Sequence, residues 1–130
     1  MINVGKHVAY WRESAEEDWA SVAVLMEKGR FRHALFFMHL AIEKALKAHV
    51  CARTGDIPPR IHNLVRLSEL TPFPDCPEGY LDFLAEANVY NIEGRYPDTS
   101  TPPPSTEEAR VLSECAGEVF RWLMNRSPQK

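Results

Sequence analysis

The chain has 130 residues, of which 45% are hydrophobic and 25% are charged. This size and balance are typical of one soluble globular domain, so we expect a single domain over residues 1–130 with a frayed tail at residues 127–130. The formal net charge of −3 argues against the cationic surface of a protein that coats duplex DNA.

The sequence contains no segment that suits a membrane or a secretion signal. No apolar run approaches the roughly 20 residues of a membrane span. Residues 1–18 turn polar and acidic where a signal peptide needs an apolar core. We therefore expect a cytoplasmic protein with no membrane partner.

The three cysteines, Cys51, Cys76 and Cys115, are odd in number and widely spaced. None has a second cysteine or a histidine nearby at the spacing of a zinc site, so we expect reduced thiols. The sequence also lacks a glycine-rich phosphate loop and a Ser/His/Asp arrangement. We accordingly predict no metal and no cofactor.

Two long helices open the chain. Apolar residues recur at steps of three and four over residues 6–28, which predicts an amphipathic helix; they are Val8, Trp11, Ala15, Trp19, Val22 and Met26. Gly29 ends this helix. A second helix over residues 30–54 must then fold back on the first as an antiparallel hairpin.

The helix over residues 30–54 is the element around which we expect the chain to fold. It carries two adjacent apolar bands, more than one neighbouring helix can cover. We therefore expect at least two packing partners, and a second copy of the chain to cover what remains. The remaining strip of the helix places His39, Glu43 and Lys47 at successive i,i+4 positions.

The remaining chain predicts three further helices. A short helix over residues 62–70, capped by Asn63 or His62, should turn Leu64, Leu67 and Leu70 inward. A helix over residues 78–94 should bury one side, formed by Leu81, Leu84, Ala85, Asn88, Val89 and Ile92. Ser105 and Glu108 form a capping box for a last helix to about residue 124. No segment alternates as a strand does, so we predict an all-α, up-and-down bundle of four long helices plus one short helix.

Several segments together resemble one known family. They are Trp11, Ala15, Asp18 and Ala23; Gly29-Arg30-Phe31; Ala34, Phe36 and Phe37; AIEKALKA at residues 41–48; His62-Asn63-Leu64 with Leu67; and YNIEGRYPD at residues 90–98. In order and spacing, this set resembles the HEPN family of small prokaryotic all-α domains. The resemblance implies a homodimer and a cytoplasmic partnership with a minimal nucleotidyltransferase, as in a toxin–antitoxin pair.

Some members of that family are ribonuclease toxins that use an arginine followed a few residues later by a histidine. Arg95 matches the arginine, but the positions of the histidine hold Ser100, Thr101 and Pro102. An arginine can bind a phosphate, whereas proton transfer near neutral pH needs the imidazole. The incomplete pair argues against nuclease activity. The alternative is a metal-independent ribonuclease in which Arg95 acts with His39 or His62.

The candidate ligand or phosphate-binding residues are Arg95, Lys44, Lys47, Glu43, Asp18 and Tyr96. Each also has a purely structural interpretation: Arg95 could pair with Asp98, Asp18 or Glu43, and the two lysines could cover apolar surface. Glu43 could orient the His39 ring. We therefore predict an interaction module that binds a nucleotide or RNA, without hydrolytic activity of its own; a homodimeric bundle with no ligand is the plainer alternative.

Overall fold

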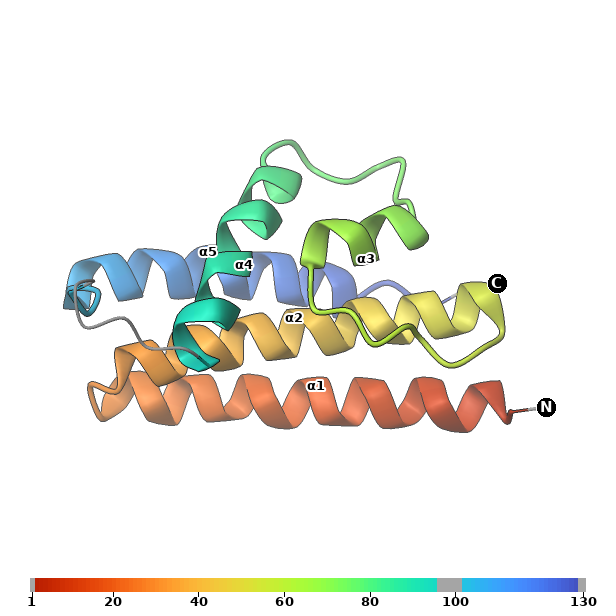
Figure 1. The fold of residues 1–130 in the computed structure, drawn as a ribbon, viewed down its shortest axis with the longest axis horizontal. Coiled ribbons are helices and arrows are strands. Elements are labelled where there is room, and N and C mark those ends of the chain that lie inside the picture. Colours follow the sequence, from red (N-terminus) through yellow and green to blue (C-terminus); the bar gives the residue numbers. More distant parts are fainter. Residues whose placement is uncertain (1, 96–101, 129–130) are drawn as a thin grey trace.

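The computed structural model describes residues 2–95 and 102–128, with side chains described for residues 2–91 and 102–128. These residues form five helices and no strand (Figure 1). The helices are α1 (Val4–Glu27), α2 (Phe31–Thr54), α3 (Leu64–Leu70), α4 (Tyr80–Arg95) and α5 (Thr106–Met124). The predicted all-α class is confirmed.

The ends of the helices follow from capping residues in the sequence. Asn3 accepts a hydrogen bond from the Lys6 backbone N–H, which starts α1 two residues earlier than predicted. The capping box of α5 is present, with Ser105 Oγ 3.1 Å from the backbone nitrogen of Glu108. Gly55 ends α2 in the left-handed conformation, with a φ of 71° that glycine adopts without a steric penalty.

Helix α2 lies at the centre of the molecule. It contacts all four other helices; α1 lies antiparallel beside it, while α4 crosses it at a steep angle (Figure 1). The expectation of at least two packing partners is therefore confirmed. Within the described residues, no helix is long and apolar enough to cross a lipid bilayer.

The argument that a second copy must cover α2 is wrong. Both apolar bands of α2 are buried by the chain's own helices, including Leu35, Met38, Ile42, Leu46 and Val50. Helices α3, α4 and α5 supply the cover that α1 cannot. The expectation of a homodimer can therefore not be based on an uncovered apolar surface of α2.

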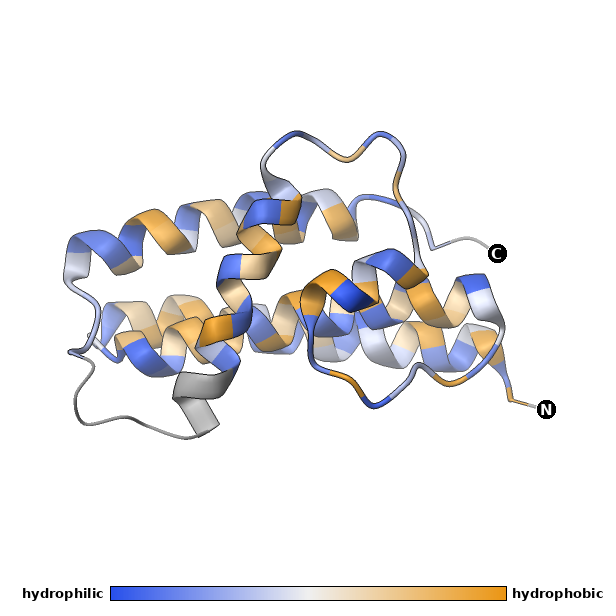
Figure 2. Cartoon of the chain, turned by 45° about the horizontal axis from the view of Figure 1, so that its top comes forward, coloured by the Kyte–Doolittle hydropathy of each residue, from blue (hydrophilic) through white to orange (hydrophobic). Residues whose placement is uncertain are grey.

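The buried side of helix α4 agrees only in part with the predicted one, since Leu84 is buried as predicted but Leu81 is not. Leu84, Ala87 and Tyr90 are buried, whereas Leu81 is 55% exposed. Of the other predicted inner residues, Val89 and Ala85 are exposed, and the side chain of Ile92 lies outside the described part. Apolar and polar residues are mixed along α4 without favouring one side (Figure 2), so its pattern does not select one face.

In the short helix α3, Asn63 is the N-cap, and its side chain accepts a hydrogen bond from the Arg66 N–H at 3.1 Å. Leu64 and Leu67 are buried as predicted. Leu70 is exposed instead, because it is the last residue of the helix, where the chain turns into the loop toward α4.

Candidate functional site

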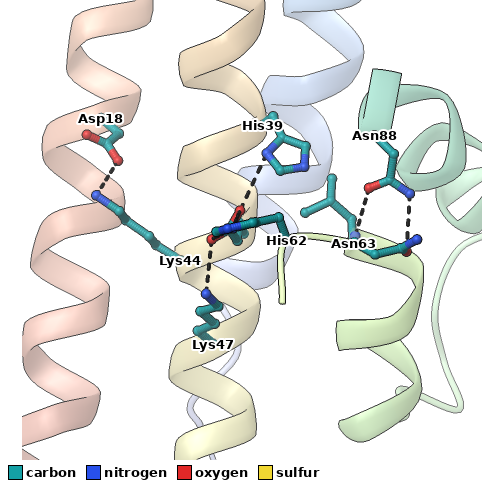
Figure 3. Close-up of polar contacts among 9 residues, drawn as sticks. Asp18, His39, Lys44, Lys47, His62, Asn63 and Asn88 are labelled. Atoms are coloured by element: carbon teal, nitrogen blue, oxygen red, sulfur yellow. Dashed lines mark hydrogen bonds and ion pairs between the residues drawn. The ribbon is translucent and has the colours of Figure 1, made fainter. Parts of the chain in front are cut away.

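The carboxylate of Glu43 is the centre of a polar cluster in the middle of α2, and Figure 3 labels its three partners, His39, Lys47 and His62. Glu43 is only 3% exposed. Its Oε2 lies 3.0 Å from Lys47 Nζ and 3.1 Å from His62 Nδ1, and its Oε1 lies 3.6 Å from His39 Nδ1. The i,i+4 spacing along α2 places two of these partners, and the loop before α3 supplies His62.

The His39 ring is fully buried on the same strip of α2. Burial lowers its pKa below 6.5, and the neighbouring Glu43 opposes this effect only in part. Neither ring nitrogen has a hydrogen-bond partner of ordinary geometry among the described residues, although Nδ1 lies 3.6 Å from Glu43 Oε1, and the backbone of His62 and the side chain of Asn88 also act to raise the pKa. His39 is therefore a neutral ring at pH 7 that solvent does not reach.

Lys47 is the buried cation of the cluster, only 6% exposed. In addition to its contact with Glu43, its ammonium group lies 5.4 Å from the centroid of the Trp11 ring on α1. Both interactions hold the charge inside the protein. Lys47 is consequently not available to a phosphate in this arrangement.

Lys44 is held in a separate ion pair on the side of α2 that faces α1 (Figure 3). Its ammonium lies 2.7 Å from Asp18 Oδ2 and donates a hydrogen bond to Ser14 Oγ at 2.8 Å. The candidate residues thus form two groups, Asp18 with Lys44 and Glu43 with Lys47, in each of which a carboxylate neutralises the lysine. These four side chains therefore form two separate ion pairs rather than one charged pocket.

His62 has a different role from the predicted one at the start of α3. Asn63 caps that helix, while His62 bonds to Glu43 with 47% of its own side chain exposed. Asn88 on α4 fixes the same end of α3, since its Oδ1 accepts from the Leu64 N–H at 2.8 Å and its Nδ2 donates to Asn63 at 3.2 Å (Figure 3). No spacing along the chain indicates either contact.

Arg95 is the last residue of α4, and its side chain lies outside the described part of the structure. Tyr96 lies entirely outside the described residues, as do Ser100 and Thr101. The predicted phosphate contact of Arg95 and its alternative ion pairs to Asp98, Asp18 or Glu43 remain predictions.

Sequence patterns did not reveal two cavities on either side of the loop that joins α3 to α4. The first has a volume of about 390 Å³ and is apolar, with Tyr80, Leu84 and Trp122 among its walls. The second, which we call the Arg53–Arg126 cavity, has a volume of about 430 Å³. Its polar walls are His49, Arg53, Thr71, Asn125, Arg126 and Ser127.

Comparisons with known proteins agree on one family. The model of the HEPN domain matches residues 8–127. The crystal structure of TT1696 from Thermus thermophilus superposes with a TM-score of 0.73 at 25% identity, covering 89% of this chain and 94% of that one. The crystal structure of ST0689, an archaeal HEPN homologue, has a TM-score of 0.69 at 22% identity, covering 89% and 93%. No curated protein matches the sequence.

Proposed function

Because this chain belongs to the HEPN domain family, we propose that it is an interaction module rather than an enzyme. In this proposal it forms a homodimer in the cytoplasm, pairs with a minimal nucleotidyltransferase in a toxin–antitoxin-like system, and binds a nucleotide. The partnership follows from the family resemblance. The lack of its own nuclease activity rests on the incomplete pair of Arg95 with a histidine, and the chemistry of α2 supports it.

The observation that supports the absence of nuclease activity is the internal pairing of the charged side chains on α2. Lys44 is paired with Asp18 and Lys47 with Glu43, so neither cation faces solvent unpaired. His39 is buried and neutral, and a general acid or base must reach the substrate within hydrogen-bond distance or through one water. These groups stabilise the contacts among α1, α2 and α3.

The partnership is tested by expressing the chain together with a small nucleotidyltransferase encoded by an adjacent gene. We expect the two proteins to co-purify, and the chain alone to elute as a dimer in size-exclusion chromatography with light scattering. An isolated gene and a chain that stays monomeric at high concentration would contradict the proposal.

Nucleotide binding is tested separately by thermal unfolding, because a ligand that binds only the folded state raises the melting temperature. We expect nucleoside phosphates to raise it in a concentration-dependent manner, while the corresponding nucleosides do not. A melting temperature that neither nucleoside phosphates nor nucleosides change would favour the plainer alternative, a helical dimer with no ligand.

One observation favours the ribonuclease alternative, and it concerns His62. This ring is half exposed, and its Nδ1 is bonded to the buried carboxylate of Glu43. A carboxylate that orients an imidazole in this way leaves the other ring nitrogen for proton transfer. The alternative is therefore a nuclease in which His62 transfers the proton and Arg95 binds the phosphate.

The alternative is tested by expressing the wild-type chain and its variants without the partner and measuring growth and cleavage of cellular RNA. A nuclease would inhibit growth, and both His62→Ala and Arg95→Ala would relieve the inhibition. His33→Ala is the matched control, since His33 is exposed on α2 and should remain as toxic as the wild type. Normal growth and intact RNA with the wild-type chain would exclude this alternative.

A further inference from the structure

The Arg53–Arg126 cavity lies where the C-terminal ends of α2 and α5 meet the loop after α3. Its volume of about 430 Å³ falls within the range of small-molecule sites, roughly 300–1,000 Å³. We propose that this cavity binds the phosphate group of a small phosphorylated molecule. The site is distinct from the residues of α2 discussed above, and it does not depend on the nucleotidyltransferase partnership.

The charge of the cavity favours an anion. None of its lining residues is acidic, and two are arginines, in a chain whose net charge is −3. Arg53 is exposed at the last turn of α2, and no described residue forms an ion pair with it. The hydroxyl groups of Thr71 and Ser127 and the amide of Asn125 add donors that phosphate oxygens can accept from.

Arginines beside helix C-termini often serve only to satisfy the last carbonyl groups. Here other side chains already do so for α5. Arg12 donates to the carbonyl of Met124 at 2.8 Å, and the His49 ring lies 2.9 Å from the carbonyl of Leu123, which accepts the hydrogen bond from Nε2. At α2, the Gly55 N–H donates to the carbonyl of Cys51. Arg53 and Arg126 are therefore not needed for capping.

Arg126 is held in the geometry that recognises an oxyanion. Its guanidinium group lies 4.6 Å from the centroid of Trp122 and 5.4 Å from that of Phe73, so the two rings fix its orientation. Its NH1 group contacts Asp75 Oδ2 at 2.7 Å. The same guanidinium fork binds a carboxylate or a phosphate, so the exposed Asp75, which does not itself line the cavity, competes with a phosphate for Arg126.

Because Asp75 pairs with Arg126, substitutions of Asp75 and of Arg53 should change the affinity for an anion in opposite directions. Asp75→Asn removes the internal carboxylate that competes for Arg126, and should therefore tighten anion binding several-fold. Arg53→Gln removes a charge-assisted hydrogen bond and should weaken it about tenfold or more. If the Asp75–Arg126 pair were only a structural contact, Asp75→Asn would not tighten anion binding.

The experiment is isothermal titration of the full chain, in low-salt chloride buffer, with inorganic pyrophosphate and with ADP. Arg66→Gln is the matched control, since Arg66 is an exposed arginine on α3 outside the cavity, and it should bind as the wild type does. Arg53 is exposed, so its substitution leaves the fold intact; circular dichroism checks each variant.

We expect saturable binding that Asp75→Asn strengthens and Arg53→Gln weakens. Equal affinities for the two probes would assign the site to the phosphate groups alone, and tighter binding of ADP would extend it to a nucleotide. No saturable binding by either the wild type or Asp75→Asn, or an unchanged affinity in Arg53→Gln, would overturn the proposal. Arg53→Gln should still co-purify with the nucleotidyltransferase, which separates this test from that of the proposed function.

Discussion

His62, in the loop before α3, places its Nδ1 3.1 Å from Oε2 of Glu43 in the middle of α2. The residue pair Pro58-Pro59 keeps the preceding loop from continuing as a helix. The loop can therefore return along α2 as far as Glu43. This contact joins α3 to the central helix through one buried carboxylate, which also holds Lys47.

Replacing the buried carboxylate should be the most damaging polar change on α2. Glu43→Ala leaves Lys47 as an unpaired cation at a buried position, which costs about 3 kcal/mol or more of unfolding free energy. Urea denaturation measures the loss, and Glu13→Ala, on the exposed side of α1, should be unchanged. A loss below about 1 kcal/mol would mean that water reaches Lys47 and that the cluster is not closed.

Replacing His39 by an apolar side chain should cost little. Its buried ring has no hydrogen-bond partner of ordinary geometry among the described residues, and Glu43, 3.6 Å away, keeps Lys47 and His62 as partners, so His39→Leu leaves no charged group unpaired. We expect the free energy of unfolding to stay within about 1 kcal/mol of the wild type or to rise. A loss of several kcal/mol in urea denaturation would show that the imidazole has a hydrogen-bond partner in solution.

Stability should decrease in mildly acidic solution because of two histidines. Burial lowers the pKa of both His39 and His49 below 6.5, opposed in part by Glu43 and by the carbonyl of Leu123 respectively. As the pH is lowered below 6.5, the unfolded chain binds protons that the folded chain does not. The free energy of unfolding therefore decreases until the pH reaches the folded-state pKa values of the two histidines.

Urea midpoints at about pH 7.5, 6.5 and 5.5 measure this dependence, in a range above the ordinary pKa values of carboxyl groups. The urea midpoint should be nearly constant above pH 6.5 and decrease below it. His39→Leu should make this decrease with pH less steep. A midpoint that rises on acidification would contradict the lowered pKa values.

The pair between Asp18 and Lys44 should contribute measurably to the contact of α1 with α2. Both side chains are largely covered, and the 2.7 Å ion pair is supported by Ser14. A double-mutant cycle with Asp18→Asn and Lys44→Met should give a coupling energy of about 1 kcal/mol. The same cycle on the exposed pair of Glu114 and Arg110 should give less, and equal coupling in the two cycles would contradict the effect of burial.

The sequence predicted the features that depend on local physics. Asn63, Ser105 and Gly55 mark helix ends because their side chains or backbone satisfy terminal groups within a few residues. The amphipathic stripe of α1 identified its packed side, where Ala15 and Val22 are buried, because steps of three and four residues place side chains on one face of a helix. These signals require no knowledge of how the helices are arranged.

The features that sequence patterns missed depend on contacts between distant segments. The buried side of α4 depends on its crossing over α2 and on the hydrogen bond of Asn88 to Leu64, because its own pattern of apolar and polar residues favours no face. The contact of His62 with Glu43 depends on the course of an irregular loop. The Arg53–Arg126 cavity combines residues of α2, the following loop and the end of α5, and no spacing relates them.

The central position of α2 also determines which part of the molecule unfolds last. Since the four other helices all pack on it, the amide protons in the middle of α2 are sheltered from every direction and should exchange with solvent only when the whole domain opens. The outer helices can fray at their ends while the middle of α2 stays folded. The slowest hydrogen exchange in the chain should therefore be that of the α2 amide protons.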